Sequence, residues 1–297
     1  MRFDVYTPLL VALLLPPVGA VVGRRVAPAR AARVLTSAAV VTAAATTWSL
    51  VLLTTALLGD APPVIRDARE DGHPLTDPVP GVIGLAACLA LAVVVWRVQR
   101  AVRAERRTRR ALRRLCAGHP RDTELVVAAC EVPRAFAIPG RPGRILVTSA
   151  MLGALAPDER RVLLAHERAH LTHRHGRLVT AATLAAAANP LLGPVRSAVA
   201  FLVERWADEQ AATEVGDRAT TARALARAAL SAGRARPSGA LGFTDRAVTR
   251  RVAALRAGPP PSRWPAAVGV LALGAVAALF AADATSDLVG LLFDALM

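Results

Sequence analysis

Two histidines one helical turn apart, with a glutamate beside the first, are the residues of this chain best placed to do chemistry. Residues 166–170 read HERAH, an HExxH pattern, on a helix predicted to begin near Pro157. The i, i+4 spacing puts the imidazoles of His166 and His170 on one face, where both can reach a single Zn²⁺ ion. Glu167 projects from the adjacent edge of that face, where it can take a proton from a water molecule. The alternative is two solvated histidines on an amphipathic helix.

A catalytic zinc ion takes three protein ligands and keeps one position open, so a third acid or histidine must come to the same place. Glu204 is the best candidate, and Asp208 follows it at the i, i+4 spacing of a helix. With Glu204 on the metal, Asp208 can hydrogen-bond a ligand imidazole. The alternative is an acid pair on a helix surface. His173 could instead complete an all-histidine site, but we interpret it as a polar residue at the helix end; the role of His175 is left open.

The segment between the two halves of this site is almost wholly apolar. It runs over residues 178–203 and is interrupted only by Asn189-Pro190 and Gly193-Pro194. Because both of its ends lie at the metal, the segment must go out and come back in two arms of about 10–12 residues, or roughly 15–18 Å as helix. Arms of that length are too short to cross a bilayer. We predict a helical hairpin that packs on the membrane face or dips into it, with a buried hairpin of a soluble core as the alternative.

Short strands and turns are expected before the histidine helix. The predicted strands cover residues 125–130, 135–138 and 144–148. We interpret the β-branched run Arg144–Thr148 as an edge strand onto which an extended substrate adds.

Four apolar segments are long enough to cross a bilayer, which takes about 20 residues. The predicted spans cover residues 5–22, 34–58, 79–98 and 264–282. The first could instead be a signal peptide, but its n-region is weakly basic and Arg24 and Arg25 follow it directly, which favours a retained span.

Arginine in the connecting segments predicts the orientation. Residues 23–33 carry four arginines and residues 97–114 carry nine, so both are expected inside, whereas residues 59–78 carry five acids against two arginines and are expected outside. Arginines up to Arg263 precede the last span on the inside. The predicted layout is three spans within 1–98, a basic juxtamembrane helix over 99–119, a cytoplasmic domain over 120–263, a fourth span over 264–282 and an outer tail over 283–297. Both termini lie outside the plasma membrane in this layout.

The composition agrees with a membrane protein. Hydrophobic residues make up 54% of the chain, the mean hydropathy is +0.40, and all of the basic residues behind the net charge of +15 are arginines. Arginine beside spans is typical of anchoring, with anionic lipid contact over 99–116 as a further function. An aromatic content of 4% offers few platforms for stacked bases, so no direct nucleic-acid partner is expected. Three scattered cysteines predict neither a disulfide framework nor a zinc ribbon.

With these motifs, the chain resembles the BlaR/MecR-type membrane metallopeptidases, which are related to HtpX-type and CAAX-processing zinc proteases. The resemblance covers about residues 115–255 and the four-span layout. The matching stretches are residues 132–137, 139–140 and 145–149, then AHERAHLTHRHG over 165–176 and ERWADEQA over 204–211.

The resemblance implies a gluzincin, in which two motif histidines and a downstream glutamate bind zinc. Glu204 stands in the place of that glutamate, and Asp208 in the place of the family's supporting aspartate. Residues 249–255 look like the family's RVxxL element, which implies that Arg251 helps to stabilise the tetrahedral intermediate. The chain departs from the family in two ways: no extracellular penicillin-binding domain is expected after the last span, and His175 and Gly176 stand where many members have an aspartate.

The sequence therefore predicts a mainly α integral-membrane protein, with four transmembrane helices and a cytoplasmic α+β zinc-protease domain inserted between the third and fourth. The predicted function is a zinc metalloendopeptidase that cleaves a cytoplasmic or membrane-proximal protein. The resemblance implies a winged-helix transcriptional repressor in a signalling pathway as one candidate substrate. The alternatives are a housekeeping quality-control protease of membrane proteins and a catalytically silent membrane scaffold.

Overall fold

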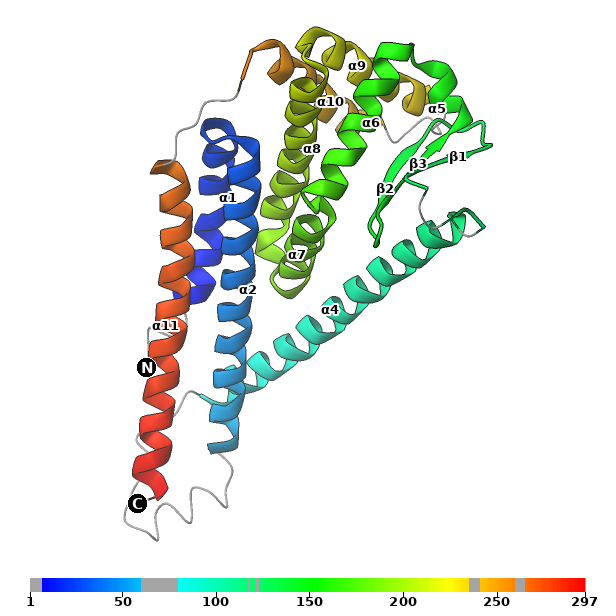
Figure 1. Ribbon diagram of the computed structural model, residues 1–297. Helices are drawn as coiled ribbons and strands as arrows, with labels where there is room; N and C mark the ends of the chain where they lie inside the picture. Colours follow the sequence, from blue (N-terminus) through cyan, green and yellow to red (C-terminus); the bar gives the residue numbers. More distant parts are fainter. Residues whose placement is uncertain are drawn as a thin grey trace.

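The computed structural model shows a mostly helical protein with one small sheet (Figure 1). It describes the backbone of residues 7–59, 80–116, 118–120, 123–234, 241–259 and 265–296. The elements are α1 (Thr7–Arg25), α2 (Pro28–Gly59), α4 (Gly81–Leu115), β1 (Leu125–Ala128), β2 (Ala135–Ile138), β3 (Arg144–Thr148), α5 (Ser149–Ala154), α6 (Pro157–Thr172), α7 (His175–Ala188), η1 (Pro190–Leu192), α8 (Gly193–Val215), α9 (Arg218–Arg234), α10 (Leu241–Arg256) and α11 (Pro265–Leu296). Helices α1, α2 and α11 lie side by side, and the sheet lies away from them at the far end of α4.

Within the residues that the structure describes, three helices are long and apolar enough to cross a membrane, and they are α1, residues Pro28–Thr55 of α2, and α4. The fourth predicted span falls on α11, whose apolar stretch Ala267–Asp283 is shorter. Small residues let these helices approach closely: a Cβ atom on Gly274 of α11 would lie 3.5 Å from the Cα of Ala38 in α2. Close contact of this kind is typical of helices packed in lipid.

Helices α4 and α11 continue more than ten residues past the ends predicted for their spans. α4 runs unbroken to Leu115, whereas the sequence predicts a span ending at 98 and a separate linker helix over 99–119. No glycine or proline lies between Gly84 and Leu115, and arginine is a good helix former, so nothing ends the helix at the apolar boundary. α11 continues to Leu296 through the predicted tail, because no proline follows Pro265.

The predicted hairpin consists of α7 and the first part of α8, joined by η1. Asn189 ends α7: its side chain accepts a hydrogen bond from the Leu191 N–H at 3.0 Å, and Pro190 follows it. Buried side chains of the hairpin form one hydrophobic core with those of α1 and α2. The Asn189 amide also lies 3.4 Å from Thr46 Oγ1, so the hairpin tip lies beside the middle of α2. The hairpin therefore packs on two candidate membrane spans.

The three strands form one sheet in the order β1-β3-β2, with β1 parallel and β2 antiparallel to β3. The prediction that Arg144–Thr148 is an edge strand is therefore wrong. Leu146 of β3 packs toward the end of α4, while Ile145 and Val147 pack toward α5 and α6. A β-branched run that is covered on both faces belongs in the centre of a sheet. The edge strand beside α6 is β2.

Some predicted features lie outside the described residues. They are residues 5–6 of the first predicted span, residues 60–78 of the predicted outer loop, residue 79 of the third span, and residues 263 and 264 before the last span.

Candidate metal centre

Helix α6 carries the two motif histidines, and its start is fixed by local contacts. Pro157 lies in the first turn, and the Glu159 carboxylate accepts a hydrogen bond from the Ala156 N–H at 2.9 Å. Glu159 is buried, and Arg227 of α9 lies 2.8 Å from it. These contacts hold the start of α6 against α9.

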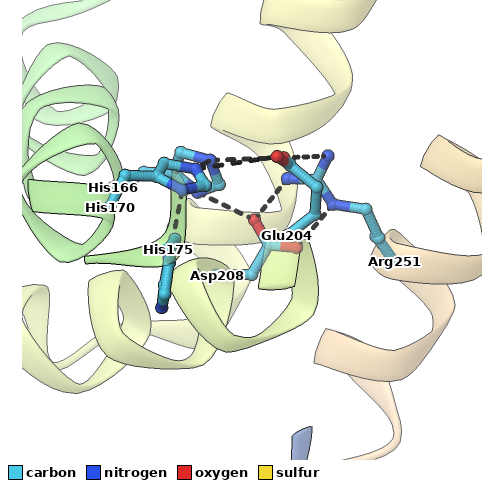
Figure 2. Close-up of polar contacts among 6 residues, drawn as sticks. All are labelled: His166, His170, His175, Glu204, Asp208 and Arg251. Atoms are coloured by element: carbon cyan, nitrogen blue, oxygen red, sulfur yellow. Dashed lines mark hydrogen bonds and ion pairs between the residues drawn. The ribbon is translucent and has the colours of Figure 1, made fainter. Parts of the chain in front are cut away.

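The side chains of His166 and His170 on α6 and of Glu204 on α8 converge on one point (Figure 2). The two Nε2 atoms are 3.1 Å apart. Glu204 Oε2 lies 3.5 Å from Nε2 of His166, and its Oε1 lies 3.7 Å from Nε2 of His170. Ligand atoms bound to a tetrahedral zinc ion at about 2.0–2.1 Å lie about 3.3–3.4 Å from one another. Two imidazoles and a carboxylate at this spacing therefore fit one zinc ion.

Asp208 and Arg251 contact the predicted ligands His166 and Glu204. Asp208 is buried, and its Oδ1 lies 3.1 Å from Nδ1 of His166. Arg251 of α10 donates from Nε and Nη2 to the two oxygens of Asp208, both at 2.7 Å, and its Nη1 lies 3.0 Å from Glu204. Because Asp208 accepts the Nδ1–H of His166, Nε2 is the ring nitrogen that faces the metal position and that a metal ion would bind in place of a proton.

Charge and burial set the pKa values of this group. Burial lowers the pKa of His166, but hydrogen bonds to Asp208 and Glu204 outweigh that effect and raise the pKa to about 10. Burial lowers the pKa of His170 to about 4, and the charge of His166 acts in the same direction. Burial alone would raise the pKa of Glu204, yet His166 and Arg251 hold that pKa well below its usual range. Two ionised acids facing His166 make this a favourable place for a cation.

Glu167 lies beside the ligands in a buried position. Burial raises the pKa of its carboxyl to about 7, although the charge of His166 opposes the change. The backbone of Ala137 in β2 hydrogen-bonds this carboxyl and also lowers the pKa. A carboxyl whose pKa lies near neutrality can both accept a proton and return it, as a general base must.

A cleft of about 450 Å³ opens next to Glu167 and the metal ligands. The segment that ends in β2 lines part of it, and a row of apolar residues on α9, most of them small, lines another part. The α9 residues are Ala224, Leu225, Ala228, Ala229, Ala232 and Gly233. A cleft of this composition accommodates an apolar side chain beside the reacting groups.

His175 contacts His170, and the sequence does not predict this contact. It is fully buried, and its Nδ1 lies 3.0 Å from Nδ1 of His170. Burial lowers the pKa of His175 to about 3, so its imidazole is neutral. His173 lies outside the group of ligands and stacks on Trp206 with ring centroids 4.6 Å apart. The left-handed residue Arg174, with φ 54°, separates α6 from α7 and turns His175 inward.

Residues 99–257 match peptidase family M48, and the matched region is more than half of the 297-residue chain. It extends from the middle of α4 to the end of α10 and includes every site residue described above. Neither a curated protein nor a solved structure matches the chain. M48 peptidases are typically zinc-dependent, in agreement with the donor set of His166, His170 and Glu204. The chain therefore belongs to peptidase family M48.

Proposed function

We propose that this M48 peptidase is a membrane-embedded zinc metalloendopeptidase that cuts proteins at the cytoplasmic surface of the membrane. The observation that carries the chemistry is the convergence of His166, His170 and Glu204 beside the buried carboxyl of Glu167. We also propose that, within the family, the chain is of the BlaR/MecR type, because its sequence has the matching motifs.

Zinc held by these three residues supplies a Lewis acid that lowers the pKa of water and polarises a carbonyl group. Glu167 takes a proton from the attacking water and delivers it to the leaving amine. Asp208 holds His166 in the tautomer whose Nε2 can bind a metal. Arg251 holds Asp208 and Glu204 in place through its paired contacts.

An extended substrate fits beside β2 rather than β3. The Thr148 N–H donates to the Arg134 carbonyl at 3.0 Å, so Phe136, two residues along, also directs its backbone groups to β3. The backbone groups of Ala135 and Ala137 therefore face the outer edge, which borders α6 and the cleft and where Ala137 hydrogen-bonds Glu167. Backbone pairing with this edge would lay a substrate across the metal centre.

The position of the site beside the ends of two candidate spans supports a substrate near the membrane surface. A Cβ atom on Gly23, near the end of α1, would lie 3.9 Å from the side chain of Leu202 on α8. The guanidinium of Arg33, in the second turn of α2, lies 4.6 Å from the ring centroid of Trp206. Glu204 lies between Leu202 and Trp206 on α8. The metal ligands therefore lie beside the end of α1 and the start of α2, which are both candidate spans. Bonds close to the membrane surface are the ones this site can reach.

The test compares purified full-length protein with its Glu167→Gln variant. Both should hold one zinc ion per chain, while the variant should lose cleavage of protein substrates. In cells, uncut membrane or membrane-proximal proteins should accumulate with the variant. A repressor encoded beside this chain would favour the signalling role, and many unrelated membrane proteins would favour quality control. Wild-type protein without stoichiometric zinc, or an active Glu167→Gln variant, would refute the proposal.

A further inference from the structure

One metal ligand, His170, contacts another histidine through the ring nitrogen that does not face the metal position. Its Nδ1 lies 3.0 Å from Nδ1 of His175, and the rings meet edge to face at 85°. We propose that His175 is a positioning residue for the metal: it accepts the Nδ1–H of His170 and so keeps Nε2 of His170 free to bind zinc. This inference rests on the metal site proposed above.

The positions of the ring protons follow from the contacts. Two Nδ1 atoms at hydrogen-bond distance require one proton between them. Nε2 of His170 faces His166 and Glu204, so it must be the bare nitrogen if it binds a metal. The proton of His170 then lies on Nδ1, and His175 accepts it and carries its own proton on Nε2. The reverse assignment puts a proton on Nε2 of His170 and blocks the metal position.

The surroundings of His175 favour the assignment that permits metal binding. Within the described part of the chain, its Nε2 is buried without a hydrogen-bond partner. The ring of Trp206 packs against it with centroids 4.4 Å apart and a tilt of 56°. An indole ring can accept an N–H group weakly but offers nothing to a bare lone pair, so this environment tolerates a proton on Nε2 of His175.

The two histidine ligands are thus held by different acceptors. His166 is held by Asp208, a carboxylate that is itself fixed by Arg251. His170 is held by a neutral imidazole, which cannot be replaced by water because His175 is fully buried. Loss of an acceptor behind a ligand imidazole typically costs about 10–100-fold in metal affinity.

The test uses two substitutions of similar size in the full-length protein in detergent. His175→Asn keeps an acceptor, because the amide oxygen lies about where Nδ1 lies, whereas His175→Leu removes it. Zinc affinity is measured by competition with a chelator of known affinity. We expect His175→Leu to bind zinc about 10–100-fold more weakly than the wild type, and His175→Asn to bind near the wild-type value. His173→Asn is the matched control, since His173 stacks on Trp206 outside the ligand group.

Thermal unfolding of the metal-free proteins separates positioning from packing. A positioning role predicts that His175→Leu loses zinc affinity while its metal-free unfolding temperature stays at or above that of His175→Asn. Equal losses of affinity and stability in both variants would show a packing role and overturn the inference. Wild-type zinc affinity in His175→Leu would also overturn it while leaving the metal site intact. A wild-type protein that binds no zinc would instead refute the proposed function.

Discussion

Arg251 contacts both acids of the metal centre, and these contacts limit what else it can do. Its Nε and Nη2 donate to Asp208, and its Nη1 lies 3.0 Å from Glu204. Three of its five N–H groups are therefore engaged. The other two are the groups that could reach a tetrahedral intermediate, the role that the family resemblance implies. Holding the acids and stabilising the intermediate predict different effects of substitution.

We expect Arg251→Lys to weaken zinc binding about 10–100-fold, because lysine cannot make the paired contact that orients Asp208 behind His166. Zinc affinity and kcat are measured together on the full-length protein. Arg250→Lys is the matched control, since the Arg250 guanidinium lies over the Phe201 ring at 4.3 Å. A variant of Arg251 that keeps its zinc affinity but loses kcat would assign Arg251 to the intermediate instead.

The sequence predicts the roles of some of the site residues but not of others. The i, i+4 spacing of His166 and His170 is a local geometry, so it predicts their meeting without knowledge of the fold. The need for a third ligand predicts Glu204, and the structure brings it to the two histidines. His175 lies five residues after His170, which on an unbroken helix would turn it away. The positive φ of Arg174 redirects it, and arginine gives no sequence signal for that conformation.

Among the elements, strand positions followed from the sequence but strand order did not. β2 and β3 occupy the predicted residues, and β1 ends two residues early. Apolar runs and turn residues are local signals, whereas the order depends on which faces the helices cover. β3 is central because α4 covers one of its faces and α5 and α6 cover the other. The sheet edge that borders α6 therefore belongs to β2.

Proline at Ala135 tests that edge. Ala135→Pro removes an N–H group that faces the cleft, so we expect kcat/KM to fall about tenfold, with zinc content and unfolding temperature unchanged. Phe136→Pro is the contrasting variant. Its N–H group faces β3 across the Phe136–Leu146 pair, so its loss should lower the unfolding temperature. Normal turnover by Ala135→Pro would show that substrates do not pair with β2.

Small residues on α9 line the cleft beside Glu167, where we propose that a substrate side chain binds. Ala228 lies in the wall of the cleft, so Ala228→Phe should fill part of it. We expect kcat/KM for substrates with a large apolar residue at the cut bond to fall about tenfold or more, with zinc content unchanged. Leu230→Phe is the matched control, because Leu230 is 66% exposed on the same helix. An equal effect of both substitutions would contradict this assignment.

For the whole molecule, one face of α4 changes from apolar to basic along its length. Exposed apolar side chains at Val82, Leu85, Leu89 and Trp96 share this face with arginines at helical spacing after it. These arginines are Arg100, Arg103, Arg107, Arg110 and Arg114. The change comes at Trp96, with the Arg100 guanidinium 5.6 Å from its ring centroid, and tryptophan is typical of the membrane interface. The composition predicts a membrane boundary here, which stays a prediction, but it does not predict that the helix continues through this point.

The three native cysteines differ in exposure, so their labelling can test which side of the membrane the metal centre faces. Cys88 is exposed on the apolar part of α4, Cys116 is buried between α4 and the sheet, and Cys130 is exposed between β1 and β2. If the metal centre faces the cytoplasm, a membrane-impermeant maleimide should leave intact cells unlabelled. The same reagent should label Cys130 in inverted membrane vesicles. Lipid should protect Cys88 in both preparations.

Detergent and one substitution provide the controls for this experiment. Detergent removes the lipid and should add Cys88 to the labelled sites, whereas Cys116 should react only after unfolding because it is 6% exposed. Cys130→Ser should abolish the signal from inverted vesicles. Labelling of Cys130 in intact cells would place the metal centre on the outer side. The arginines of α4 would then lie outside as well, against the charge distribution that membrane insertion favours.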